Sequence, residues 1–221
     1  MTVRAVIFDL DNTLAVPVRS RTTMLDRATR RVGAPRVSRT DYLAAHRSNI
    51  ARETRSPIFA SLLAESDVDP DTLAAAYRSE IADSLRSVVG AHDLICDLRH
   101  DYRVGLLTNG PSVAQRDKLR VLGWSDLFDG VVITGEIGVA KPDPGAFEAI
   151  LSVLEVRADE AVYIGDEPSM DVIGASASGL QPIQVHFPGG PRIDARAVAT
   201  VDRDRIASEL PAVLDRLEND D

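Results

Sequence analysis

Cysteine and long hydrophobic runs are almost absent from this 221-residue sequence. Cys96 is the only cysteine, which excludes an internal disulfide. No apolar run approaches the roughly 18 residues of a membrane-spanning helix, and the first residues enter a predicted strand without the pattern of a signal peptide. We therefore expect a cytoplasmic protein without a membrane partner.

Lysine is also scarce, and the overall charge is negative. Only Lys118 and Lys141 occur among 25 basic residues, so each lysine can be considered individually. The formal net charge of −9 predicts a surface that repels nucleic acids, and we expect no nucleic-acid partner. An aspartate-rich, lysine-poor composition is typical both of high-GC genomes and of salt-adapted organisms.

Five short apolar runs predict strands, and segments with helical period separate the later ones. A chain of this length can hold one large domain, or a core domain with a smaller insert. The alternation of strand and helix predicts an α/β fold, a doubly wound parallel-sheet Rossmann-like core with helices on both faces. The predicted strands are residues 4–8, 104–107, 131–133, 162–164 and 183–186.

Residues 17–88 interrupt this alternation. They contain helical periods and turn signals but no convincing strand. About 70 residues can bury a small core of their own. We therefore predict a helical cap domain at 17–88, inserted into a core domain of residues 1–16 and 89–221. The predicted cap helices are residues 24–32, 40–52, 58–64 and 70–85.

Two helix starts in the core carry capping signals. Ser112 followed by Gln115 predicts a capping box, and Gly123 predicts the end of that helix. Asp143 followed by Pro144 predicts an N-cap and a first-turn proline for a later helix. Both signals support helices between the predicted strands.

Polar side chains follow the apolar runs at the places where the predicted strands end. In a parallel sheet, ligands bind beyond the carboxyl ends of the strands, so we expect these side chains to converge. Asp9, Asp11 and Thr13 follow the first predicted strand, and Thr108, Asn109 and Gly110 follow the second. A loop after the third strand leads to Lys141. Asp166 follows the fourth strand, and Asp171 lies five residues later.

So many carboxylates at one edge suggest a bound cation. Asp9 and Asp166 can coordinate Mg²⁺, which prefers oxygen ligands and would offset the repulsion between them. The metal would also hold a phosphoryl oxygen. Asp9 then becomes a nucleophile, and Asp11 can reach the leaving-group oxygen as a general acid.

The remaining polar groups suit a phosphate. Lys141 and Thr108, with backbone amides near Asn109 and Gly110, can stabilise the charge on a transferring phosphoryl group. The residues therefore predict phosphoryl transfer from a small phosphorylated metabolite.

Four short segments resemble, in order, the four signature motifs of the haloacid dehalogenase-like (HAD) hydrolase superfamily. They are "DLDNT", the threonine of "LLTNG", the lysine of "GVAKPDP" and "GDEPSMD". The insert resembles the helical C1 cap of subfamily I. The resemblance implies Asp9 as nucleophile, Asp11 as acid/base with its backbone carbonyl on the metal, Thr108 and Lys141 on the phosphate, Asp166 on Mg²⁺, and Asp171 in support. From their place at the strand ends we also expect Asn109 on the phosphate and Thr13 in support.

Individual residues distinguish the reactions of this superfamily. Its dehalogenase branch lacks the second aspartate of the first motif, whereas this chain has Asp11. Its phosphonatase branch needs a cap lysine, and residues 17–88 contain none. A phosphatase with a phosphoaspartyl intermediate fits best. The alternatives are a phosphomutase acting on a sugar phosphate, which uses the same two aspartates, and a catalytically idle binding or regulatory protein.

The cap gives fewer indications. Arg47, Arg52 and Arg55 could present a cationic surface to the substrate, although charged helix residues commonly face solvent. A cap that closes over the site favours small substrates such as phosphoglycolate, sugar phosphates or nucleoside monophosphates. We expect a monomer or a homodimer.

Overall fold

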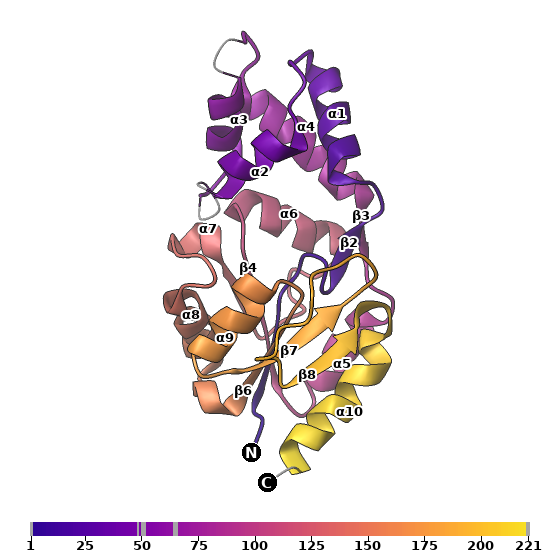
Figure 1. Cartoon of the computed structure of the whole chain (residues 1–221), viewed down its shortest axis with the longest axis vertical. Helices are drawn as coiled ribbons and strands as arrows, with labels where there is room; N and C mark the ends of the chain where they lie inside the picture. The colour runs from indigo at the N-terminus through magenta and orange to yellow at the C-terminus, as the bar shows by residue number, and fades with distance from the viewer. Residues whose placement is uncertain (1, 48, 50–51, 64–65, 220–221) are drawn as a thin grey trace.

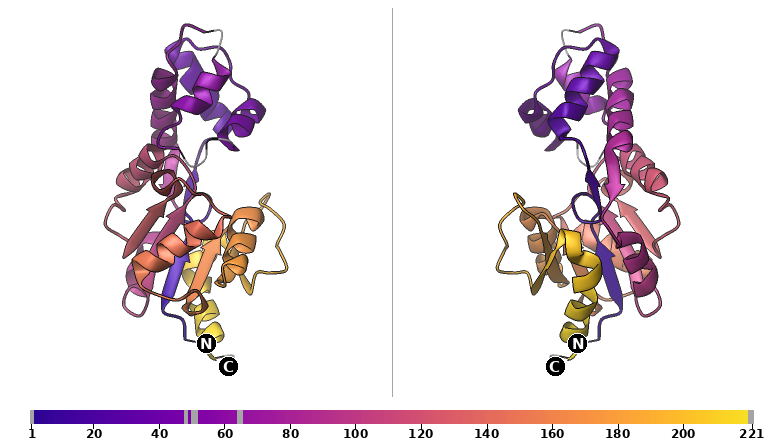
Figure 2. Two further views of the ribbon diagram at one scale, coloured as in Figure 1. Left: turned by 90° about the vertical axis from the view of Figure 1, so that its left-hand side faces the viewer. Right: turned by 90° about the vertical axis from the view of Figure 1, so that its right-hand side faces the viewer.

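The computed structural model describes residues 2–47, 49, 52–63 and 66–219. A parallel sheet flanked by helices forms the core, and four helices form a cap beyond one end of it (Figure 1). Figure 2 shows from two sides that the cap projects from the core, while both chain ends lie at the opposite end. The predicted α/β core with an inserted helical cap is confirmed.

The core sheet has six parallel strands in the order β5-β4-β1-β6-β7-β8. Because successive strands are added first on one side of β1 and then on the other, their direction of progression reverses at β1, and a ligand crevice is expected there at the carboxyl ends. The strands are β1 (Ala5–Phe8), β4 (Arg103–Thr108), β5 (Gly130–Ile133), β6 (Ala161–Gly165), β7 (Gln181–His186) and β8 (Ala199–Asp202).

Helices cover both faces of the sheet, as the near-continuous burial of β1 and β6 requires. On one face, α5 (Ala91–Leu98) and α10 (Ile206–Asn219) supply apolar side chains to the core. On the other, α8 (Pro144–Leu154) and α9 (Ile173–Ala177) pack against the strands. Shorter helical segments are α7 (Thr134–Ile137), Ala158–Glu160, Pro168–Val172 and Arg203–Arg205.

The cap has a hydrophobic core of its own, built around Met24, Phe59 and Tyr77. A separate core explains how an insert of this size stays folded beside the sheet. The residues that the structure describes contain no helix with the length and hydrophobicity of a membrane span. The cap helices are α1 (Arg21–Val32), α2 (Arg39–Arg47), α3 (Ser56–Leu62) and α4 (Pro70–Ser84).

Three strands were not expected from the sequence. The antiparallel pair of β2 (Ala15–Pro17) and β3 (Leu85–Ser87) joins cap to core, so the expectation that residues 17–88 lack strands is wrong at Pro17 and at 85–87. The sixth core strand, β8, was also missed. These strands have only three or four residues each, too few for a periodic pattern. The domain boundaries at 17 and 88 stay a prediction. The strand β2 ends at Pro17 and β3 ends at Ser87, next to these two boundaries.

The capping signals had different outcomes. Asp143 caps α8, since its carboxylate accepts the Gly145 N–H at 2.9 Å, as predicted. The capping box predicted for Ser112 and Gln115 is wrong. Pro111 precedes the first residue of α6 (Ser112–Leu122), and the Gln115 side chain turns into the core instead of back to the helix start.

A close backbone contact joins the cap to the core. The Glu53 carbonyl accepts hydrogen bonds from the Ser112 hydroxyl and the Val113 N–H, each at 3.2 Å. Gly135 lies under this contact. A Cβ at position 135 would meet only backbone atoms, at 2.5 Å from the Arg52 oxygen and 2.6 Å from the Ser112 nitrogen. Glycine is therefore required there for the cap to approach.

We expect Gly135→Ala to lower the free energy of unfolding by about 1–3 kcal/mol, because backbone atoms on both sides cannot move aside. Gly145→Ala is the matched control, since its Cβ would meet only side-chain atoms at 3.3 Å or more, and we expect a change within about 0.5 kcal/mol. Urea unfolding of both variants measures this. Equal stability of the two would contradict the contact.

Candidate active site

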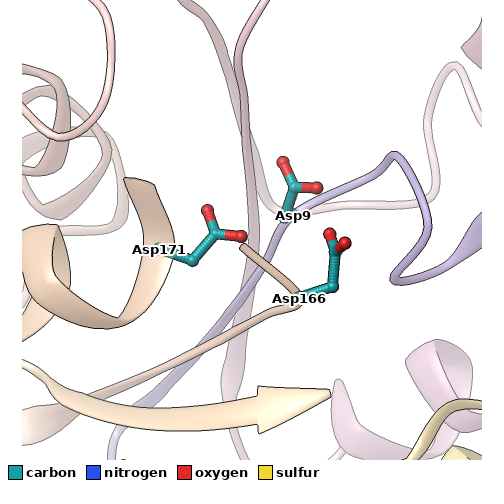
Figure 3. Close-up of side chains that lie close together, drawn as sticks. All are labelled: Asp9, Asp166 and Asp171. Atoms are coloured by element: carbon teal, nitrogen blue, oxygen red, sulfur yellow. The ribbon is translucent and has the colours of Figure 1, made fainter. Parts of the chain in front are cut away.

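The predicted strand-end residues meet in one pocket at the carboxyl edge of the sheet. Figure 3 shows the carboxylates of Asp9, Asp166 and Asp171 turned towards a common space. A larger hollow of about 450 Å³ lies at the amino ends of β1 and β4 and contains none of these three residues. The carboxyl-edge pocket is about 180 Å³ and is lined by Asp9, Asp11, Asn12, Asn109, Lys141, Asp166, Glu167, Met170 and Asp171.

The Lys141 ammonium is the central cation of this pocket. It is buried and donates to Asp9 Oδ1 at 2.8 Å and to Asp171 Oδ1 at 2.7 Å. Its third contact is the Tyr163 hydroxyl at 2.6 Å. Burial lowers the pKa of Lys141, but Asp171 and Asp9 outweigh burial and raise this pKa well above its usual range. Lys141 therefore stays charged and fixes the position of Asp9.

The Asn109 side chain holds Lys141 in place, and Gly165 gives Asp171 its space. The Asn109 side chain donates to the Lys141 carbonyl at 3.0 Å and accepts the Lys141 N–H at 2.9 Å. The Lys141 backbone therefore engages both polar atoms of the Asn109 carboxamide. Gly165 leaves room for Asp171, since a Cβ there would lie 2.4 Å from the Asp171 carboxylate. That carboxylate also accepts the Glu167 N–H at 2.9 Å.

A tight turn after β1 separates Asp9 from Asp11. Asn12 has φ 63°, a left-handed conformation that asparagine adopts more readily than most residues. Its N–H donates to the Ala15 carbonyl at 2.9 Å and closes the turn. Thr13 is fully buried, and its hydroxyl has no hydrogen-bond partner in the part of the chain that the structure describes. The turn places Asp11 against α6 while Asp9 faces Asp166.

Asp9 and Asp166 retain protons more strongly than ordinary aspartates. Burial raises the pKa of Asp166 to about 8, and the nearby Asp9 and Asp171 carboxylates add to the effect. Burial also raises the pKa of Asp9 to about 7 against the opposing charge of Lys141. Within the described residues Asp166 pairs with no cation, and its contact to the Asn12 amide is long, at 3.5 Å.

This surplus of buried carboxylate oxygen fits a divalent metal. Asp9, Asp166 and Asp171 each offer an oxygen, and these oxygens lie within 4.8 Å of one another. Asp171 is already engaged by Lys141 and the Glu167 N–H, so Asp9 and Asp166 have the greater free capacity. Hard cations with oxygen ligands take this kind of site.

Asp11 lies in the opposite electrostatic environment. Lys118 donates to both of its carboxylate oxygens, at 2.7 and 2.5 Å, and Arg21 of the cap lies 3.4 Å from one of them. Gln115 donates to the other at 3.1 Å. Burial alone would raise the pKa of Asp11, but Lys118 and Arg21 outweigh burial and hold this pKa well below its usual range.

Thr108 and Gly110 are held by neighbouring side chains. The buried Thr108 hydroxyl accepts from Gln115 Nε2 at 2.6 Å, so Gln115 links Thr108 to Asp11. The Gly110 N–H, predicted to be available to a phosphate, donates to the Thr134 hydroxyl at 3.1 Å. The Thr108 hydroxyl can still donate its own proton to an anion.

Four participants were missed at the level of sequence: Tyr163, Gln115, Lys118 and Arg21. Tyr163 lies inside an apolar strand and carries no distinguishing signal. Gln115 and Lys118 lie three residues apart on α6, a spacing that places both on one helix face. Because Lys118 is one of two lysines, that spacing could have identified it.

The three predicted cap arginines occupy different environments. Arg47 and Arg52 are exposed, whereas Arg55 is 6% exposed. Arg55 Nε donates to the Tyr42 hydroxyl at 3.1 Å, and its guanidinium lies 5.7 Å from the centre of the Tyr77 ring. Only Arg55 is therefore built into the cap interior.

The raised pKa values of Asp9 and Asp166 predict a pH dependence of stability. Without metal, the folded protein binds these protons where the unfolded chain has lost them, from about pH 4 to pH 8. We therefore expect the free energy of unfolding to fall as the pH rises through this range. In Asp166→Asn the free energy of unfolding should fall less over this range. Urea unfolding at pH 5, 6, 7 and 8 measures this free energy for both proteins. An identical pH slope in both proteins would contradict the assignment.

Known proteins resemble this chain in sequence and in structure. Glyceraldehyde 3-phosphate phosphatase of Pyrococcus furiosus is 30% identical over 146 residues, which are 66% of this chain and 60% of that protein. Pyrimidine 5'-nucleotidase YjjG of Escherichia coli is 31% identical over 123 residues, 55% of each chain. The crystal structure of a HAD phosphatase from Thermococcus onnurineus has a TM-score of 0.69 at 26% identity, covering 94% of this chain and 98% of that one.

The chain thus spans 60% or less of the length of these two curated relatives. A model of the haloacid dehalogenase-like hydrolase family matches residues 3–179. That match includes all four cap helices α1 to α4 and every strand-end residue described above. The predicted family is confirmed: this chain belongs to the haloacid dehalogenase-like hydrolases.

Proposed function

We propose that this protein is a Mg²⁺-dependent phosphatase that hydrolyses a small soluble phosphomonoester through a phosphoaspartyl intermediate. The observation that carries the proposal is the Asp9 carboxylate, fixed by Lys141 at 2.8 Å beside Asp166 in the carboxyl-edge pocket. A positioned carboxylate can act as a nucleophile when its attacking oxygen is held in place. One curated relative is named a phosphatase and the other a 5'-nucleotidase, and both names support the same reaction class.

The chemistry divides between the two aspartates. Asp9 attacks phosphorus, the bond from phosphorus to the alcohol oxygen breaks, and a protonated Asp11 gives its proton to the departing alcohol. Because Lys118 and Arg21 hold Asp11 as a carboxylate in the structure, this step requires both cations to leave Asp11 when the substrate binds. Water then attacks the acyl phosphate, Asp11 accepts a proton from that water, and Asp9 is regenerated as phosphate leaves. Thr108, Lys141 and the Asn109 backbone bind the phosphoryl oxygens and stabilise their charge.

Mg²⁺ fits the carboxylates that lack a cation. Asp9 and Asp166 would hold the ion, with the Asp11 carbonyl, and Asp171 and Thr13 would support them. When bound, Mg²⁺ supplies positive charge that neutralises the phosphoryl oxygens. Lys141 keeps Asp9 oriented throughout, because its bonds to Asp9 and Asp171 are made by the protein alone.

The cap completes the proposal. Its four helices, in the proposed domain 17–88, would exclude bulk water and select the alcohol part of the substrate, with contacts from Arg47, Arg52 and Arg55. A small phosphorylated metabolite of the cytoplasm is the proposed partner. We propose a monomer or homodimer that binds neither nucleic acid nor membranes.

A phosphate-release screen over a panel of small phosphomonoesters tests the function. With Mg²⁺ we expect wild-type protein to release phosphate from at least one of them and from p-nitrophenyl phosphate. Excess chelator should abolish release. Asp9→Asn should lower the rate by about 10⁴-fold or more, because it removes the nucleophile. Substantial activity in folded Asp9→Asn, or in protein shown to be metal-free, would contradict the proposal.

The role of Asp11 predicts a dependence on the leaving group. A phenolate departs with less help from a proton than an alkoxide. We therefore expect Asp11→Asn to slow phosphorylation of Asp9 by an alkyl phosphate more than by p-nitrophenyl phosphate. Single-turnover kinetics with both esters measure the difference. Equal slowing for both would show that Asp11 does not donate the proton.

A further inference from the structure

Three basic side chains gather where the cap meets the core: Arg21 at the start of α1, Arg55 before α3, and Lys118 in α6. Arg21 and Lys118 both contact the Asp11 carboxylate. Burial lowers the pKa of His46 to about 4, and the charges of all three cations add to the effect. Arg55 and His46 both contact the Tyr42 side chain, which places Arg55 beside His46. We call Arg21, Arg55 and Lys118 the junction cluster.

The junction cluster carries an excess of positive charge. Within the described residues, Asp11 is the only carboxylate that forms an ion pair with any of its three cations. Lys118 and Arg55 are buried, with exposed fractions of 3% and 6%. A buried cation without an anion is costly, because it loses hydration without gaining a partner. An incoming anion would remove that cost.

Arg55 is the cation with free capacity. Its Nε donates to Tyr42, and the Tyr77 ring lies beneath its guanidinium. In the part of the chain that the structure describes, its two terminal nitrogens donate to no acceptor. His46 stacks on Tyr42 with ring centres 5.8 Å apart, and the buried Nδ1 of His46 likewise has no described partner. The contacts with Tyr42 and Tyr77 orient the Arg55 guanidinium before any ligand arrives.

The junction cluster lies on the side of the pocket where a leaving group would sit. Asp11 lines the phosphate pocket and simultaneously contacts Arg21 and Lys118. In the proposed reaction Asp11 faces the departing alcohol. The rest of that alcohol would then extend past Asp11 towards Arg21 and Lys118, the two cations that contact it.

We infer that the junction cluster binds a second anionic group of the substrate. The substrate is then a phosphomonoester whose alcohol part carries a carboxylate or a second phosphate, and Arg55 is the main determinant of this preference. This inference rests on the proposed phosphatase function and narrows its substrate class. Planar guanidinium groups suit both kinds of anion, since each can accept paired hydrogen bonds.

Matched substrate pairs test the inference. The pairs are 2-phosphoglycolate with 2-hydroxyethyl phosphate, 3-phosphoglycerate with glycerol 3-phosphate, and fructose 1,6-bisphosphate with fructose 1-phosphate. The first two pairs report on a carboxylate and the third on a second phosphate. The measurement is the ratio of kcat/KM within each pair, for wild type, Arg55→Gln, Arg55→Lys and Arg39→Gln. Arg39 is an exposed arginine of α2 and serves as the charge-matched control.

We expect wild-type protein to prefer the anionic member of at least one pair by about 10-fold to 100-fold, as one or two charge-assisted hydrogen bonds allow. Arg55→Gln should remove most of that preference through KM, Arg55→Lys should keep part of it, and Arg39→Gln should leave the ratio unchanged. Arg39→Gln should leave activity on the neutral member unchanged, and in both Arg55 variants the loss on the anionic member should exceed any loss on the neutral member.

Two results would overturn the inference: no preference for an anionic member in any pair, or equal losses on both members in Arg55→Gln. If buried Arg55→Gln fails to fold, as judged by circular dichroism, Arg21→Gln tests the same ratio at a side chain that is 29% exposed. An unchanged ratio there would also overturn it. Failure of the proposed function is a separate result, because p-nitrophenyl phosphate would then not be hydrolysed at all.

Discussion

One buried ammonium serves three partners at the carboxyl edge of the sheet, and the geometry of the site depends on it. Lys141 contacts Asp9, Asp171 and the Tyr163 hydroxyl, all within 2.8 Å. Without this charge, three buried carboxylates would repel one another in a medium of low dielectric constant. Two hydrogen bonds with the Asn109 side chain hold the Lys141 backbone, and the absence of a Cβ at Gly165 leaves space for the Asp171 carboxylate.

Asp9 and Asp11 are two residues apart but experience opposite electrostatic environments. Burial and neighbouring carboxylates raise the pKa of Asp9 and of Asp166, whereas Lys118 and Arg21 lower that of Asp11. A general acid ordinarily has the raised pKa and a nucleophile the lowered one. The proposed roles therefore require bound Mg²⁺ to lower the pKa of Asp9, and Asp11 to lose its contacts with Lys118 and Arg21 before it can hold a proton. Asp11 lies directly before the left-handed residue Asn12, and its side chain contacts Lys118 of α6 and Arg21 of the cap.

The fold class and the strand-end residues could be predicted because their signals are local. A buried parallel strand reads as an apolar run, and the polar residue after it must lie at the carboxyl edge. Other features depend on distant partners. The strands β2 and β3 pair with each other although the whole cap domain separates them in the sequence. The strand β8 has a single buried residue. The Gln115 side chain contacts Thr108 and Asp11 instead of capping its own helix. Local pattern does not reveal which neighbour such a side chain meets.

Direct detection of the covalent intermediate tests the central claim, which is that Asp9 carries the phosphoryl group. Wild-type protein and Mg²⁺ are mixed with the best substrate from the screen, quenched in acid within milliseconds and digested, and the peptides are analysed by mass spectrometry. The account predicts an acyl phosphate on Asp9 that forms and decays at rates compatible with turnover. Phosphate release without a modified Asp9, or with the phosphoryl group on another residue, would contradict it.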